Sequence, residues 1–311
     1  MITFVCPVQE INDANALSVR LASPRFVSTR IPIRVPKYRV RLAACVNLHW
    51  DLESLVAATG FDSFIDDWLK FHLLAGVEEI VVYVSDNSFA RAAPGFSGHP
   101  QVVSVDNFLT GPEESAPIRI FAEAAKAIHP RIFNAQSLSH CVARLKGVAK
   151  WVVLVPGFDV YLSSPFHLQA SKVDRWGWLE KLMVSLDRGE GEKIASLLVA
   201  DVEFGRGESA ASSGPRPSLF STYQQRGEPH IRKPLLNILN PENVLEVGTS
   251  HFVVPRPGAH LLRMDPEVLR ANHYIDAATP GMPSRCENCV IFDGSLAALD
   301  EELAAIDDSS L

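Results

Sequence analysis

Short apolar runs alternate along the chain with segments in which apolar residues recur at helical spacing. Five runs have the length and composition of buried strands, and they span residues 41–48, 79–85, 101–105, 151–155 and 194–202. After the first run, apolar residues recur at helical spacing from Phe64 and stop at Gly76, with a capping-box-like start at Ser63. Residues 136–146 predict a second helix, and residues 244–254 one or two more strands. Alternating strands and helices predict an α/β fold, a mostly parallel open sheet with helices on both faces.

The flanking segments differ from this central pattern. Residues 1–39 lack it and contain several prolines and arginines, so we expect an irregular arm packed on a domain that spans residues 40–280. Within that domain, residues 207–218 are small, polar and proline-containing, which predicts a mobile loop. Residues 281–311 form a C-terminal segment with a predicted surface amphipathic helix, whose apolar positions are Leu296, Leu299, Leu303 and Ile306.

Polar residues come directly after several of the predicted strands. In an open α/β sheet, ligands bind outside the carboxyl ends of the strands, so these residues are candidates for a binding site. They are Asn47, Asp86, Asn87, Ser88, Asp159, Asp201 and Glu203. Asp and Asn at such places also commonly stabilise turns, so each position has a structural alternative to a binding role.

The composition narrows the class of protein. The chain has 311 residues and a net charge of -7, which argues against a protein that binds nucleic acid. The sequence contains no apolar stretch of about 18 residues, so we expect no transmembrane segment. The N-terminus lacks the basic and apolar pattern of a signal peptide. We therefore expect a cytoplasmic location, or one that the sequence does not identify.

Five cysteines are spread thinly along the chain, and an odd number at such spacing does not predict a disulfide framework. Cys286 and Cys289 form a lone C-x-x-C motif. Structural zinc needs four ligands, so a single pair is a poor zinc site. Two reduced thiols and a local disulfide both remain possible for this pair.

A series of short motifs covers residues 40–280: the helical segment 64–77, Tyr83-Val-Ser-Asp-Asn-Ser88, Gln136 to Cys141, Lys150-Trp151, Phe204-Gly205, Arg232-Lys233-Pro234, Pro241, His251 and Asn272-His273-Tyr274. In order and spacing this series resembles glycosyltransferase family 92 and its family-2-like bacterial relatives. Each motif alone is weak, and their combination makes the resemblance specific.

The resemblance implies a GT-A fold and an inverting transfer of a sugar from a nucleotide-sugar donor to a glycan or another hydroxyl acceptor. It implies a divalent cation, Mn²⁺ or Mg²⁺, on the donor diphosphate, with Asp159 at the metal-binding turn and His251 or His273 closing the site. The residues expected on the donor are Asn47, Asp86, Asn87, Ser88, Asp159 and Lys233.

The metal motif departs from the family pattern. The family reads W-x-x-x-x-D-x-D-E-F, whereas here Pro156 and Phe158 occupy the two Asp positions and Asp159 the Glu position. One carboxylate is a loose clamp for a divalent cation, so we expect weak or absent metal binding and low activity. His273 or Lys233 are alternative sources of positive charge. The competing hypotheses are a catalytically degenerate protein that binds a nucleotide sugar or glycan, and a scaffold protein that kept the fold.

An inverting transfer also needs a general base near the acceptor hydroxyl. Asp201 and Glu203 end the predicted strand that borders this space. Because side chains alternate between the faces of a strand, we expect one of the two carboxylates to face outward, and Glu203 is the candidate base.

Overall fold

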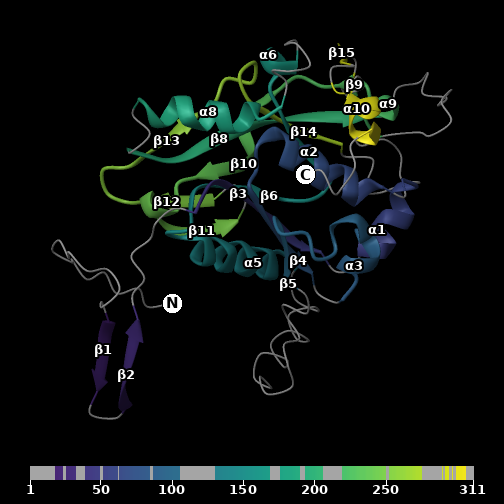
Figure 1. The fold of residues 1–311 in the computed structure, drawn as a ribbon. Helices are drawn as coiled ribbons and strands as arrows, with labels where there is room; N and C mark the ends of the chain where they lie inside the picture. Colours follow the sequence, from purple (N-terminus) through teal and green to yellow (C-terminus); the bar gives the residue numbers. More distant parts are fainter. Residues whose placement is uncertain are drawn as a thin grey trace.

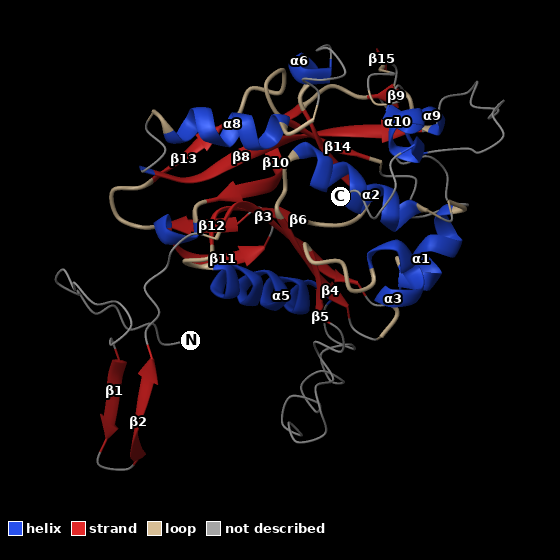
Figure 2. Cartoon of the chain, in the orientation of Figure 1, coloured by secondary structure: helices blue, strands red, loops and turns tan. Residues whose placement is uncertain are grey.

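The structure, a computed structural model, centres on an eleven-stranded mixed sheet (Figures 1 and 2). It describes residues 18–23, 26–32, 39–49, 52–61, 63–84, 87–105, 130–168, 176–189, 193–205, 219–249, 252–274, 289, 291–293, 296 and 299–305. Because this sheet is combined with helices along the chain, the predicted α/β class is confirmed.

One half of the sheet is doubly wound. Its strands lie in the order β5-β4-β3-β6, and all neighbours in this half are parallel. The strands are β3 (Val40–His49), β4 (Glu79–Val84), β5 (Val102–Val105) and β6 (Ala149–Val155). Along the chain, β4 and β5 are added on one side of β3, and β6 is then added on its other side. The predicted central strand at Trp151 is confirmed, because β6 lies between β3 and β10.

The other half is antiparallel in part, so the large, mostly parallel sheet that the sequence predicts is also mixed. Strand β10 (His230–Leu239) lies antiparallel between β6 and β8 (Ile194–Gly205). Beyond it, β8 pairs in parallel with β13 (His260–Arg263) and β14 (Arg270–His273). β7 (Val160–Ser163) runs antiparallel to β14. Two short strands, β9 (Gln225–Arg226) and β15 (Ile291–Phe292), extend the edge.

Helices cover both faces of the doubly wound half, as the sequence predicts. Alternate residues of β3, β4 and β6 belong to two separate apolar clusters, one on each face. Helix α2 (Phe64–Ala75) and helix α8 (Trp178–Asp187) pack on the first cluster, and helix α5 (Pro130–Leu145) packs on the second (Figure 1). The hairpin of β11 (Val244–Thr249) and β12 (Phe252–Pro255) lies beside α5.

Short elements complete the described chain. They are α1 (Leu52–Thr59), α3 (Phe89–Ala92), α6 (Pro165–Leu168), α9 (Leu219–Thr222), α10 (Asp300–Ala305) and the 3₁₀ turns η2 (Pro94–Phe96) and η5 (Pro241–Asn243). In the C-terminal segment Leu296, Leu299 and Leu303 are buried, as an amphipathic helix predicts. The predicted mobile loop at 207–218 lies outside the described residues.

The N-terminal arm is not irregular throughout. Strands β1 (Ser18–Ser23) and β2 (Phe26–Pro32) pair as an antiparallel hairpin. Their sequences contain Val, Ile, Thr and Phe, which favour strands. The prediction of an irregular arm, which rested on the prolines and arginines, is therefore wrong for these two strands. The packing of the arm on the domain stays a prediction.

Helix α2 begins differently from the prediction and ends as predicted. Ser63 makes no capping hydrogen bond, and its hydroxyl instead donates to Asp67 Oδ2 at 2.6 Å. Gly76 closes the helix with φ of 109°, in the left-handed region. A side chain there would also meet the Cβ of Glu180 at 2.8 Å, so glycine is required for the approach of α8.

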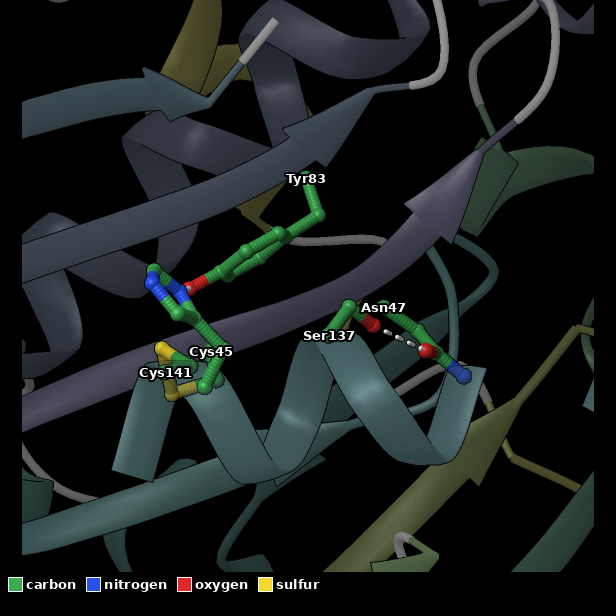
Figure 3. Close-up of a disulfide and its surroundings, with 6 residues drawn as sticks. Cys45, Asn47, Tyr83, Ser137 and Cys141 are labelled. Atoms are coloured by element: carbon green, nitrogen blue, oxygen red, sulfur yellow. Dashed lines mark hydrogen bonds between the residues drawn. A yellow bond between two sulfur atoms is a disulfide. The ribbon is translucent and has the colours of Figure 1, made fainter. Parts of the chain in front are cut away.

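The cysteines pair where the sequence did not predict a bond. Cys45 of β3 and Cys141 of α5 form a disulfide across 96 positions of the chain (Figure 3). Spacing along the chain carries no information about this pairing, since strand and helix meet only in the folded sheet. Cys289 is also disulfide-bonded.

Candidate functional site

The parallel strands place their carboxyl ends at one edge of the sheet. β3, β4 and β6 are mutually parallel, and β8 shares their direction because both β6 and β8 are antiparallel to β10. The order reverses between β3 and β6, which makes this the switch point of the doubly wound half. Crevices at such switch points, outside the carboxyl ends, are where open α/β sheets bind ligands.

In the turn after β6, the side chain of Phe158 lies in the core and that of Asp159 lies at the edge of the sheet. Phe158 is only 1% exposed and packs edge-on against Trp68, with ring centroids 5.1 Å apart. Trp68 in turn donates a hydrogen bond from Nε1 to the carbonyl of Val160 at 2.8 Å. The position that carries the second Asp in the family pattern is therefore part of the apolar core. The neighbouring Asp159 is half-buried and turns toward β14.

His273 lies between two carboxylates. Its Nε2 is 3.3 Å from Asp159 Oδ2, and its Nδ1 is 3.7 Å from Asp201 Oδ1, an ion-pair distance that is too long for a hydrogen bond. The backbone also joins the two strands here, because Tyr274 N–H donates to the carbonyl of Asp159 at 2.8 Å. Three residues from different parts of the chain thus meet: Asp159 precedes β7, Asp201 lies within β8 and His273 ends β14.

The two carboxylates decide the charge of the His273 ring. Burial opposes protonation, but the contacts with Asp159 and Asp201 and their negative charges outweigh it and raise the pKa of His273 to about 10. The ring is therefore an imidazolium at neutral pH, and it donates from Nε2 to Asp159. Asp201 Oδ1 and His273 Nδ1 are buried without a hydrogen-bond partner among the described residues.

Glu203 forms a second pair near this cluster. Its Oε1 is 3.7 Å from Nε2 of His230, the residue of β10 that pairs with Asp201. The Glu203 side chain is 30% exposed, against 13% for Asp201. The expectation that only one of these two carboxylates faces outward is wrong: residues two apart share a face, and the intervening Val202 is the buried one.

The remaining expected donor residues have other surroundings. Asn47 is buried and accepts a hydrogen bond from Ser137 of α5 at 3.2 Å, on the α5 face of the sheet (Figure 3). Ser88 is buried, and its hydroxyl accepts from the backbone N–H of Leu52 at the start of α1. Asn87 is exposed just after β4. These contacts give Asn47 and Ser88 a structural role at the strand ends.

Lys233 has a defined backbone position at the same edge. It lies in β10 between His230 and Pro234, which pair with Asp201 and Ala200. The sequence candidates Asp86 and His251 lie outside the described residues, as does Cys286. The structure therefore brings together Asp159, Asp201, Glu203, His273 and the backbone of Lys233.

His230 is the site residue that sequence reasoning missed. It is exposed beside Glu203, but in the sequence it stands in a polar stretch before Arg232 and carries no periodic or motif signal. Only the pairing of β10 with β8 reveals it.

Among the described residues, no group of three or more His, Cys, Asp and Glu side chains is arranged to hold a metal ion. The physical reason is that the His273 ring separates Asp159 from Asp201, so each nitrogen faces a different carboxylate. Protein sites for Mg²⁺ commonly use one or two carboxylates together with waters and substrate phosphates.

None of the helices in the described part of the chain is both long enough and apolar enough to cross a bilayer. Comparison with known proteins gives no family: no family model matches the chain, and no curated protein is significantly similar to it.

Proposed function

We propose that the chain is a glycosyltransferase-like protein of the GT-A type, which transfers a sugar with inversion from a nucleotide-sugar donor to a glycan or another hydroxyl acceptor. The observation that carries this proposal is the strand order β5-β4-β3-β6, with Asp159 in the turn that follows β6 at the switch point. Nucleotides bind at this place in open α/β sheets. The ordered motifs over residues 40–280 support the same reading.

In this proposal the donor lies across the ends of β3, β4 and β6. The nucleoside meets the residues after β3 and β4, where Asn87 is exposed. The diphosphate needs positive charge, and Lys233 of β10 is the candidate because its backbone stands at the same edge. His273 supplies a charge that Asp159 and Asp201 already neutralise, so its role is to hold the turn at Asp159 in place.

Glu203 is the proposed general base. Its carboxylate is more exposed than that of Asp201, which is committed to His273. Glu203 takes the proton of the acceptor hydroxyl as the acceptor oxygen bonds to the anomeric carbon of the donor. The bond from that carbon to the diphosphate oxygen breaks, and the nucleoside diphosphate leaves with the electron pair.

A second candidate is a catalytically degenerate protein that binds a nucleotide sugar or a glycan without transfer. The burial of Phe158 against Trp68 favours it, since the core fills the place of a metal ligand. A scaffold protein that kept only the fold would bind no donor at all.

A thermal-shift screen with UDP-, GDP- and CMP-sugars, each with and without manganese, separates these functions. A ligand that binds only the folded chain raises Tm by mass action, by an amount equivalent to about 2.7 kcal/mol at a hundredfold excess over Kd. We expect one donor class to raise Tm, and the absence of any shift would leave only the scaffold.

Donor hydrolysis and transfer then distinguish the enzyme from the binding protein. We expect Glu203→Gln to keep the donor-induced shift in Tm and to lose turnover. The matched control is Glu246→Gln on the exposed side of β11, which should change neither. Equal turnover in both variants would contradict the role of Glu203.

A further inference from the structure

Helix α5 is a polar helix under the centre of the sheet. Its outer face is polar, whereas Leu138, Cys141, Val142 and Leu145 are buried in the second apolar cluster. Specific contacts add to this apolar packing. Ser139 donates to the carbonyl of Val247 in β11 at 2.6 Å, and His140 Nδ1 lies 2.7 Å from the hydroxyl of Tyr83 in β4.

The strongest of these contacts is covalent. Cys45 and Cys141 are both fully buried, and their disulfide joins the middle of α5 to β3, the strand at the switch point (Figure 3). Ser137 is one turn before Cys141 on the helix, and Asn47 is two residues after Cys45 on the strand. The hydrogen bond between Ser137 and Asn47 therefore lies next to the disulfide on the same pair of faces.

We propose that the Cys45–Cys141 disulfide is a structural lock that fixes α5 beneath the end of β3, and that the chain acquires its native fold in an oxidising compartment. The bond forms by thiol–disulfide exchange: the two thiols lose two protons and two electrons, and a disulfide donor of the compartment is reduced to its dithiol. Such bonds persist in secretory, periplasmic and extracellular settings and are rare in the cytosol. The proposal thus opposes the cytoplasmic location expected from the sequence, and the disulfide at Cys289 points the same way.

The lock also bears on the candidate crevice. Reduction would release α5 from the strand whose carboxyl end borders the switch point, and the neighbouring Asn47 would lose its fixed partner Ser137. Because a crosslink over 96 positions restricts the unfolded chain strongly, its loss should lower stability markedly.

Peptide mapping of the chain refolded with oxidised glutathione tests the bond directly. Thiols are alkylated under denaturing conditions before digestion without reduction. We expect a crosslinked peptide pair that contains Cys45 and Cys141. Alkylation of both cysteines in a chain that melts cooperatively would overturn the proposal. We expect the same refolding in dithiothreitol to give a chain of lower Tm, and an unchanged Tm would overturn the need for an oxidising compartment.

The double variant Cys45→Ala with Cys141→Ala tests the lock without a redox reagent. We expect its Tm to fall by about 5–15 °C, with faster amide exchange in α5. The control is Gln136→Ala, an exposed substitution on the same helix that leaves every disulfide intact. A fall no larger than that of the control would overturn the proposal.

Discussion

Phe158 is a core residue at a position where the family motif has a metal-binding residue. Phe158 stands where the resemblance leads one to expect a metal-binding Asp, but its ring is packed against Trp68. A carboxylate at this position would be buried without a partner, which is costly. Reversing the departure from the family pattern therefore requires repacking the turn and α2, and a single substitution would not suffice.

We expect Phe158→Ala to lower the free energy of unfolding by about 3–5 kcal/mol, because it removes a buried aromatic ring and leaves a cavity. Urea denaturation measures the change. The matched control is Phe166→Ala in α6, where the ring is 75% exposed and the expected change is within about 0.5 kcal/mol. Similar losses in both variants would show that Phe158 is not a core residue.

His273 should make stability depend on pH above neutrality. Its pKa in the folded chain, about 10, lies above the ordinary value of 6.5. The protonated ring therefore stabilises the fold fully below pH 6.5, and this contribution is lost as the pH rises through 10. His72 does not contribute in this range, since burial lowers its pKa to about 3 and keeps it neutral.

Urea denaturation at several pH values between 6.5 and 10 measures this dependence. We expect stability to fall with rising pH in the native chain, and to fall less in Asp201→Asn, which removes one of the two charges on the ring. His273→Gln should remove the contribution altogether. An unchanged pH dependence in His273→Gln would show that another group is responsible.

At the scale of elements, fully buried strands were the most predictable part of the fold. The apolar runs at β3, β4 and β6 match the structure to within two residues, because strands covered on both faces are apolar throughout. Strand β10 was not predicted: it contains charged residues and Pro234, and it becomes a strand through its pairing with β6 and β8. Its position makes the sheet mixed, and no local pattern encodes that choice.

The candidate site likewise contains residues that the sequence predicted and residues that it did not. Asp159 was found because it follows a predicted strand, Asp201 because it stands near the end of one, and His273 because of a motif. The structure brings all three together. His230 was missed since only strand pairing brings it to Glu203. The disulfide was missed for the same reason, as β3 and α5 are joined by the sheet and not by sequence spacing.

At the scale of the whole molecule, the candidate site combines the switch point of the sheet with several carboxylates. The doubly wound half supplies the switch point, and the mixed half brings β8 and β14 to the same edge. Two carboxylates, Asp159 and Asp201, face the imidazolium of His273, and a third, Glu203, lies beside His230. A diphosphate approaching this edge therefore depends on cations that come from β10, or on a metal ion that it brings with it.

This charge distribution predicts how the chain responds to manganese. A cation that entered the cluster without donor would find one carboxylate on either side of the His273 ring, and it would have to displace the proton that both carboxylates hold there. We therefore expect calorimetry to show weak or no manganese binding by the free chain. Asp159→Ala should reduce donor binding only modestly, because the charge of Asp159 is already paired with the His273 ring 3.3 Å away. Tight manganese binding without donor, abolished by Asp159→Ala, would contradict this and would assign Asp159 to an ordinary metal-dependent transferase.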